Sequence, residues 1–170
     1  MSEPRFRVER LAADHDRSTF ACGSQPLDRY LHEQASQDER RSVAACYVAA
    51  DERSKIAGYY TLATSSVDLT ELPAGLRKKL PRYPTVPAVL MGRLAVSKDH
   101  QGIGLGAALL ADAIERWIRM DVAAYALLVD AKDDAAAAFY TKHGFLAFEG
   151  SPRRLFLPIA TAKNLQARKG

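Results

Sequence analysis

Cysteine is scarce in this chain, and its possible metal ligands are not grouped. The sequence has two cysteines, Cys22 and Cys46, and neither belongs to a CxxC pair or to a Cys/His cluster. The four histidines show no spacing typical of metal ligands. We therefore expect two reduced cysteines of a cytosolic protein, no disulfide framework and no metal site.

Long apolar runs are also missing. The first residues, MSEPRFRVERLAADHDRS, contain no apolar core of the signal-peptide type. No apolar run approaches the roughly 20 residues that a membrane-spanning helix needs. The sequence therefore predicts a cytoplasmic protein with no membrane partner.

A large excess of one charge sign is absent too. The 170 residues include 24 Lys and Arg against 20 Asp and Glu, which gives a net charge of +4. This mildly basic balance permits an anionic partner but does not require one. Because the chain shows no repeats and no linker, we expect a single domain over residues 1–170, with a polar, frayed tail from about residue 160 to residue 170.

The order of the expected elements indicates a mixed α/β sheet. Stretches rich in alternating or β-branched residues predict antiparallel strands at 6–11, 43–50 and 56–64. Ser24 is expected to cap a helix over 26–37. The second half then alternates strands and helices, at 89–96, 105–120, 125–129, 134–143, 145–148 and 154–157. Antiparallel strands followed by crossover helices are typical of a mixed α/β fold.

The glycine-rich stretch from Gln101 to Gly106 carries the clearest ligand-binding signal. It follows a predicted strand and begins a predicted helix. Glycines let a backbone approach a ligand closely, and the first helical turn has free N–H groups and a partial positive charge. We therefore expect a phosphate-bearing cofactor at this loop.

Residue patterns alone leave several interpretations of this loop. Gly102, Gly104 and Ala107 satisfy the dinucleotide-binding pattern G-x-G-x-x-G/A, but the pattern does not follow the strand directly. A phosphate-binding P-loop fails because no Gly-Lys-Ser/Thr follows. A plain glycine turn that only begins a helix is a further alternative.

A family resemblance favours another interpretation. Gln101-x-x-Gly104-x-Gly106, after Leu94-Ala95-Val96, resembles the acyl-CoA loop of the GCN5-related N-acetyltransferases. The segment Ala138-Phe139-Tyr140-x-x-x-Gly144-Phe145 resembles the second half of that family. Five more stretches are similar to the acetyltransferase toxins of bacterial toxin–antitoxin pairs: Phe20-x-Cys22-Gly23, Leu27-x-x-Tyr30-Leu31, Ala45-Cys46-Tyr47-Val48, Gly58-Tyr59-Tyr60-Thr61-Leu62, and Leu80-Pro81-x-Tyr83-Pro84-x-x-Pro87 leading into Leu90-Met91-Gly92-Arg93-Leu94-Ala95-Val96. The likeness spans about residues 6–158.

The resemblance implies a fold and a cofactor. The expected fold has antiparallel N-terminal strands followed by a βαβ unit with a splayed central pair of parallel strands. The expected cofactor is acetyl-CoA. The residues expected to bind it are Leu94, Ala95, Val96, Gln101, Gly102, Ile103, Gly104, Leu105, Gly106, Ala107, Asp133 and Phe139.

Direct transfer of an acetyl group from a thioester to an amine needs no catalytic triad. A backbone N–H near Ala95 or Val96 is expected to stabilise the thioester oxygen, and one such donor is typically worth ~3 kcal/mol. Tyr140, which the resemblance places beside the sulfur, is expected to protonate the leaving thiolate. From its spacing alone, Tyr140 is equally well explained as a core aromatic. No side chain is identified as the base, and the α-amine of an aminoacyl group is partly neutral near pH 7.

In the toxin subgroup the acceptor is the amino group of an aminoacyl-tRNA, and acetylation blocks translation. The resemblance therefore implies a tRNA substrate, a ribbon-helix-helix antitoxin and a homodimer. The residues expected to contact tRNA phosphates, unless they form only a solvated face, are Arg77, Lys78, Lys79, Arg82 and Arg93, with Arg153 and Arg154 extending the surface. Two alternatives stay open: an N-acetyltransferase for small amines or protein N-termini, and a non-enzymatic acyl-CoA-binding module.

Overall fold

The computed structural model describes residues 5–169 and divides into two compact units. The first unit holds residues up to 63 and residues 92–113, and the second holds 64–91 and those from 114 onward. Seven strands form a mixed sheet in the order β1-β2-β3-β4-β5-β7-β6. The expected mixed α/β fold is confirmed. The strands are β1 (Arg7–Arg10), β2 (Ala45–Ala50), β3 (Ile56–Asp68), β4 (Thr85–Val96), β5 (Ala126–Asp130), β6 (Leu146–Phe148) and β7 (Ser151–Pro158).

The helices alternate with these strands much as the sequence predicts. The N-terminal helical segment consists of α1 (Gln25–Arg29), a π-helical turn η1 (Tyr30–Gln34) and α2 (Ala35–Arg40). The others are the 3₁₀ turn η2 (Leu69–Glu71), α3 (Ala74–Arg77), the 3₁₀ turn η3 (Lys98–His100), α4 (Leu105–Ile118), α5 (Asp134–Lys142) and α6 (Ile159–Lys169). None of the helices within residues 5–169 combines the length and apolar character needed to cross a bilayer.

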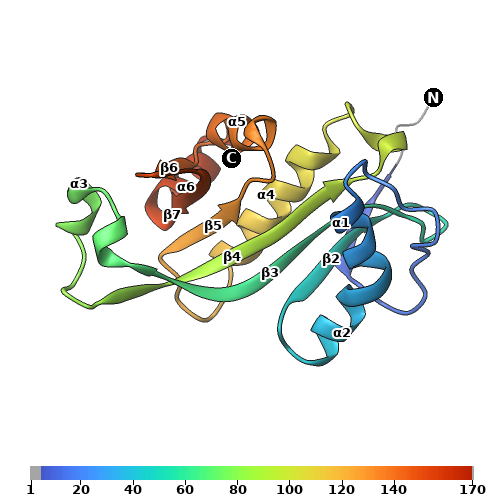
Figure 1. The fold of residues 1–170 in the computed structure, drawn as a ribbon, viewed down its shortest axis with the longest axis horizontal. Coiled ribbons are helices and arrows are strands. Elements are labelled where there is room, and N and C mark those ends of the chain that lie inside the picture. Colours follow the sequence, from blue (N-terminus) through green and yellow to red (C-terminus); the bar gives the residue numbers. More distant parts are fainter. Residues whose placement is uncertain (1–4, 170) are drawn as a thin grey trace. The chain divides into compact units, whose positions relative to one another are not determined.

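The first unit is built on an antiparallel meander of β1, β2 and the start of β3. The helical segment lies beside β2 (Figure 1), and its buried side chains join the strands in one apolar cluster. Leu31 from the helical segment, Val48 from β2 and Tyr59 from β3 are all fully buried there. This cluster fixes the helical segment against the meander.

The start of the helical segment differs from the expectation. Ser24 stands at the N-cap position as predicted, but its side chain makes no capping hydrogen bond. Instead, the backbone N–H of Cys22 donates to the carboxylate of Asp28 at 2.8 Å. Asp28 lies in the first turn of the helix, so its hydrogen bond with the Cys22 N–H connects the helix to the chain before it.

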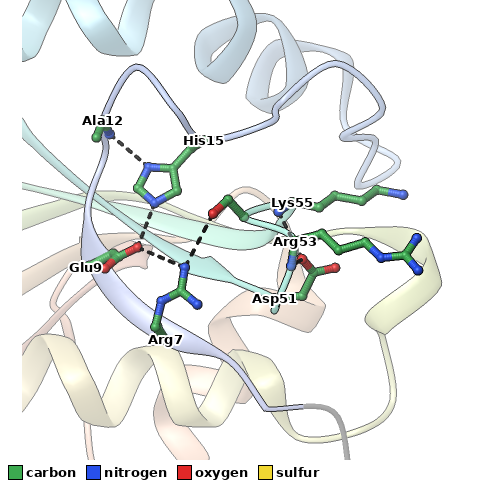
Figure 2. A network of polar contacts seen from close by, with 8 residues as sticks. Arg7, Glu9, Ala12, His15, Asp51, Arg53 and Lys55 are labelled. Atoms are coloured by element: carbon green, nitrogen blue, oxygen red, sulfur yellow. Dashed lines mark hydrogen bonds and ion pairs between the residues drawn. The ribbon is translucent and has the colours of Figure 1, made fainter.

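A polar network ties the first strand to the turn that follows it (Figure 2). His15 is buried, its Nδ1 accepts the Ala12 N–H at 2.9 Å, and its Nε2 lies 2.8 Å from a carboxylate oxygen of Glu9. The same carboxylate is 3.6 Å from Arg7, which also donates to Ser54. Because Nδ1 accepts a backbone proton, His15 is neutral in this arrangement and donates from Nε2 to Glu9.

The second unit is built around β5, whose residues Ala126 to Val129 are fully buried. It pairs in parallel with β4, from Ala88↔Ala126 to Met91↔Val129, and antiparallel with β7. A run of apolar residues with no alternation is what a strand covered on both faces requires. The parallel ladder covers only the first part of β4, as expected for a strand pair that splays.

The C-terminal segment corrects the sequence analysis. The expected frayed tail over residues 160–170 is instead the helix α6, with Gly170 outside the described residues. Ala162 is fully buried, and a Leu165 methyl group lies 3.1 Å from where a Cβ on Gly144 would be. The apolar residues of this polar segment lie on one face, and packing of that face holds the helix.

Candidate active site

The glycine loop of the first unit is a preformed, exposed turn between η3 and α4. Gly102 and Gly104 have φ angles of +82° and +86°, which L side chains rarely adopt. A Cβ on either glycine would meet nothing within 4 Å, so open space lies over the backbone. The next residue begins α4, whose first N–H groups have no intrahelical partner. This geometry fits a phosphate group at the loop, as the sequence predicts.

The Gln101 side chain holds this loop in place. Its amide Nε2 donates to the backbone oxygen of Val96 at 3.0 Å and to that of Cys22 at 2.9 Å. The side-chain amide is therefore engaged with the protein. Sequence analysis expected a cofactor contact from Gln101, and the structure adds a positioning role that the motif alone does not reveal.

The strand before the loop is packed tightly against β3. A Cβ on Gly58 would lie 3.0 Å from the backbone oxygen of Ala95 and 2.8 Å from a Leu109 methyl group. Ser97 donates its backbone N–H to Ala57 at 2.8 Å, which continues this contact past the end of β4. The absence of a side chain at Gly58 thus lets α4 and the end of β4 approach β3 closely.

Tyr140 lies in the second unit, on α5, and is 6% exposed. Its ring packs against Phe139 and Phe145, with centroid distances of 5.3 and 5.5 Å. Burial raises the pKa of the Tyr140 phenol above its ordinary value of 10.0. The phenol therefore stays protonated at neutral pH, but a raised pKa also makes it a weaker acid than an exposed tyrosine, so the shift by itself does not identify a proton donor.

The bounds of α5 match the predicted helix over 134–143 to within one residue, and local contacts define both of its ends. The carboxylate of Asp133 accepts the Ala136 N–H at 2.8 Å and caps the helix. Gly144 follows the helix with a φ of +98°, and Phe145 donates its backbone N–H to the backbone carbonyl oxygen of Tyr140. Asp133 was expected to bind the cofactor, and the structure shows its side chain engaged in capping the helix that carries Tyr140.

The basic residues fall into two groups. Arg77, Lys78, Lys79 and Arg82 are all exposed on α3 and the following loop of the second unit, and they form what we call the basic cluster. Arg93 is half-buried in the first unit, where its guanidinium carbon lies 3.5 Å from the centroid of the Tyr30 ring. The structure thus gives Arg93 a cation–π contact that the sequence analysis did not anticipate.

Tyr30 is itself part of a polar arrangement missed at the sequence level. Its hydroxyl donates to Asp38 at 2.8 Å, and Gln34 donates to the same carboxylate at 3.0 Å. Burial is the main cause that raises the pKa of Tyr30, and the hydrogen bond to Asp38 raises it further. The hydrogen bonds that Asp38 accepts from Gln34 and Tyr30 lower the pKa of Asp38. The only signal for it lies in the spacing of Tyr30, Gln34 and Asp38, which places them along one helical face.

Other chemistry finds no support among the residues that the structure describes. No group of three or more His, Cys, Asp or Glu side chains within residues 5–169 could hold a metal ion. Both cysteines are buried free thiols, and burial raises the pKa of Cys46 to about 12. Cys46 is therefore a protonated core residue and not a nucleophile.

The comparisons with known proteins agree with this geometry. The family model for the acetyltransferase (GNAT) domain matches residues 42–146. This chain belongs to the GNAT acetyltransferases. The predicted acetyl-CoA-dependent N-acetyltransferase is confirmed at the level of the family.

The acetyltransferase is also similar to individual proteins along most of its length. It is 34% identical to the tRNA-acetylating toxin of Mycobacterium tuberculosis, over 92% of this chain and 93% of that protein. Its fold matches that of AtaT complexed with acetyl-methionyl-tRNAfMet, with a TM-score of 0.88, 30% identity and coverage of 95% and 99% of the two chains. It also matches a mutant AtaT toxin bound to the C-terminus of the antitoxin AtaR and acetyl-CoA, with a TM-score of 0.79, 28% identity and coverage of 95% and 98%.

Proposed function

We propose that this protein transfers the acetyl group of acetyl-CoA to the α-amino group of an aminoacyl-tRNA and so blocks translation as a toxin. The observation that carries the proposal is the 34% identity to a tRNA-acetylating toxin over 92% of this chain. The acceptor is thus argued from the relatives, while the donor site is argued from the geometry of the loop as well.

The donor side of the reaction uses backbone groups of the first unit. When bound, acetyl-CoA supplies the thioester that the amine attacks. The N–H groups of residues 102–107, at the open turn and the start of α4, bind its pyrophosphate. The backbone of Leu94–Val96 orients the pantetheine amides. A backbone N–H of Ala95 or Val96 stabilises the charge that develops on the thioester oxygen, worth ~3 kcal/mol for one such donor.

Tyr140 is the proton donor in this proposal. Its phenol gives a proton to the departing CoA thiolate. Phe139, half-buried beside it, flanks the donor. The acceptor needs no base from the protein, because an α-amine with a pKa of about 8 is partly neutral at pH 7.

The basic cluster contacts the tRNA backbone. Its four side chains are exposed and lie within six consecutive positions, 77–82, so they can follow a run of phosphates. Arg93 adds a further contact from its exposed portion. Such contacts position the substrate without reading its sequence.

The proposal extends to partners and organisation. We infer that the chain acts as one acetyltransferase domain in the cytoplasm, where charged tRNA is found. A ribbon-helix-helix antitoxin holds it inactive, and the active form is a homodimer. The AtaT toxin bound to the C-terminus of AtaR supports an antitoxin partner.

The decisive experiment incubates the protein with acetyl-CoA and a mixture of charged tRNAs and follows N-acetyl-aminoacyl-tRNA by mass spectrometry. Product is expected from wild type, and much less from Tyr140→Phe. The absence of product with every charged tRNA would contradict the proposal. Acetylation of free amines or protein N-termini under the same conditions would favour the small-substrate alternative. Binding of acetyl-CoA without acetylation of any amine would identify a non-enzymatic module.

The role of the basic cluster has its own test. Removing one phosphate contact is expected to reduce the slope of log K for tRNA against log [salt] by about 1. Lys79→Gln should show this reduction, whereas Lys163→Gln, on the exposed face of α6, should not. Equal slopes for both variants and wild type would mean that the cluster is only a solvated face.

A further inference from the structure

Arg93 is held by an aromatic ring and not by a hydrogen bond. It stands on β4 in the first unit, and its guanidinium carbon lies 3.5 Å from the centroid of the Tyr30 ring. That distance is well inside the range of about 6 Å over which a cation and an aromatic face attract each other. Within residues 5–169, no hydrogen bond or ion pair engages the N–H donors of Arg93. The Tyr30 ring is therefore the group that orients this guanidinium.

The N–H donors of Arg93 are open to a ligand. The side chain is half-buried, and none of its nitrogen atoms is both buried and without a partner among the residues that the structure describes. Its unpaired N–H groups therefore reach the surface. A guanidinium that packs on an aromatic ring can still present the N–H groups at its edge, and this planar set matches two oxygens of one phosphate. The arrangement offers an anion a charged donor set that is already oriented.

Tyr30 is itself a rigid support. It is 6% exposed, and its ring is nearly parallel to that of Tyr59, with an interplanar angle of 16° and a centroid distance of 6.2 Å. Its hydroxyl donates to Asp38 at 2.8 Å, and Gln34 donates to the same carboxylate. Tyr30 begins the π-helical turn η1, and such turns are frequent at functional sites. Packing on one side and a charged acceptor on the other thus fix this ring.

Asp38 acts on Arg93 through the tyrosine rather than by pairing with it. The hydrogen bond from Gln34 is the main cause that lowers the pKa of Asp38, and the positive charge of Arg93 contributes, so the two charges influence each other. A carboxylate paired directly with the guanidinium would occupy the edge that a phosphate needs. Because Tyr30 and Gln34 engage this carboxylate, that edge stays open. The charged acceptor also polarises the phenol, which strengthens the attraction of its ring for a cation.

We propose that Tyr30 and Asp38 are positioning residues that hold the guanidinium of Arg93 ready to bind a phosphate of the tRNA. Arg93 makes the contact, and the other two residues act only through it. The inference rests on the proposed tRNA substrate, and it explains why a half-buried arginine is stacked on a tyrosine instead of being paired with the nearby carboxylate. A side chain that is ordered before binding loses less conformational entropy when the ligand arrives.

A double-mutant cycle of Tyr30→Phe and Arg93→Gln tests this coupling. Dissociation constants for uncharged tRNA are measured without acetyl-CoA at several salt concentrations. Phenylalanine keeps the ring but frees the Asp38 carboxylate to draw the guanidinium away, so Tyr30→Phe should weaken binding about fivefold. Arg93→Gln should weaken it at least as much and reduce the slope of log K against log [salt] by about 1. In the Arg93→Gln background, the effect of Tyr30→Phe should vanish.

Tyr59→Phe is the matched control. Tyr59 is buried in the same apolar cluster, but its hydroxyl donates to the Leu27 backbone oxygen, so its removal frees no carboxylate. This variant should leave the affinity for tRNA and the salt slope unchanged. Equal affinities of Tyr30→Phe and wild type overturn the inference. So does an effect of Tyr30→Phe that is equal in both backgrounds, because Tyr30 would then act on the fold and not through Arg93.

A measurement on the wild type does not depend on the folding of any Tyr30 variant. The Cζ atom of Arg93 lies over the Tyr30 ring, so the ring current should shift its ¹³C resonance upfield of those of the other arginines. The resonance is assigned by its loss in Arg93→Gln, and it should stay upfield when tRNA is added. An ordinary shift in the free protein, or a return to it on binding, overturns the inference.

These readouts separate the inference from the proposed function. Acetylation of charged tRNA together with an additive cycle would overturn the inference and leave the function standing. A coupled cycle without acetylated product would support the positioning of Arg93 and contradict the function. Absence of tRNA binding by the wild type would overturn the inference directly.

Discussion

At the scale of single residues, two buried tyrosines of this chain differ in their hydrogen bonding and in the roles we assign to them. Tyr140 and Tyr59 are both buried, and burial raises the pKa of each. Tyr59 donates its hydroxyl proton to the Leu27 backbone oxygen at 2.6 Å, so it is committed to the core of the first unit. Tyr140 stands on the helix whose cap and end match the sequence prediction. Only the family resemblance distinguishes a catalytic tyrosine from a core one in advance.

Replacing Tyr140 with phenylalanine is expected to lower kcat by about 10²- to 10³-fold, because general-acid catalysis typically contributes that much. The packing against Phe139 and Phe145 is kept, so the thermal midpoint should change little. Initial rates with charged tRNA give the measurement. Tyr125→Phe is the control, because Tyr125 is a half-buried tyrosine whose pKa is also raised by burial. A full rate in Tyr140→Phe would show that the thiolate leaves without its proton.

The pH profile follows from the same residue. Burial raises the pKa of Tyr140, so the acid form persists as pH rises through the range in which the acceptor amine loses its proton. We expect kcat/KM to rise through about pH 8 with the amine and to stay level up to about pH 10. A fall that sets in below pH 9, absent in Tyr140→Phe, would mean that the phenol ionises too early to be the donor.

At the scale of elements, the glycine loop depends on backbone conformation rather than on side-chain contacts. Gly104→Ala puts a Cβ on a residue with φ of +86°, and a non-glycine residue in this region costs about 1–2 kcal/mol. The loop should relax to another shape, and the KM for acetyl-CoA should rise about tenfold with kcat nearly unchanged. Gly75→Ala in α3 is the control, because its Cβ meets nothing within 4 Å and its φ is ordinary. A normal KM in Gly104→Ala would mean that the loop does not bind the cofactor.

The helices and strands also show which structural features can be predicted from the sequence. The loop, the meander and α5 were predictable because their signals are local: glycines, β-branched alternation, and Asp133 and Gly144 at the helix ends. The π-helical turn was not, because an extra residue in one turn leaves no mark in composition. Helical spacing predicts that Leu27, Tyr30, Leu31 and Gln34 share one face. In the structure Tyr30 and Leu31 are buried as expected, but Ala35 is buried in place of Gln34, which is exposed.

Two further misses have the same physical origin. The segment of α6 is polar on average, and its stability depends on packing of Ala162 and Leu165 against groups distant in sequence. A depression lined in part by Arg154 likewise joins η2 to the β6–β7 hairpin some eighty positions later. Tertiary contacts of this kind leave no local pattern, so sequence analysis could name Arg154 as basic but could not show that its Nε atom is buried.

At the scale of the whole molecule, the proposed roles are divided between the two units. The glycine loop belongs to the first unit, while Tyr140 and the basic cluster belong to the second. Strand β3, strand β4 and helix α4 pass from one unit into the other. Each of these long elements therefore contributes residues to both units.

Acid should weaken the first unit in particular, because three of its carboxyl groups have lowered pKa values. The hydrogen bond from His15 lowers the pKa of Glu9, and the hydrogen bonds from Ser18 lower the pKa of Asp16. The hydrogen bond from Gln34 is the main cause of the lowered pKa of Asp38. A lowered pKa stabilises the fold at pH above the unfolded value, near 4, and this contribution disappears as pH falls through the folded value. Urea midpoints should therefore be level from pH 7 to 5 and decline below about 4. The triple variant Glu9→Gln, Asp16→Asn, Asp38→Asn should show a flatter decline, and an equally steep one would contradict this assignment.

The anchoring of the glycine loop has a consequence for control of the enzyme. Ala21 accepts the Lys98 N–H at 2.8 Å, and Cys22 accepts the Gln101 amide, so the loop is fastened to the segment before α1. Backbone carbonyls far from the loop in sequence thus set its shape before any ligand arrives. We therefore expect that a protein partner which displaces residues 21–22 distorts the loop proposed to bind acetyl-CoA, and so inhibits the enzyme without contacting Tyr140.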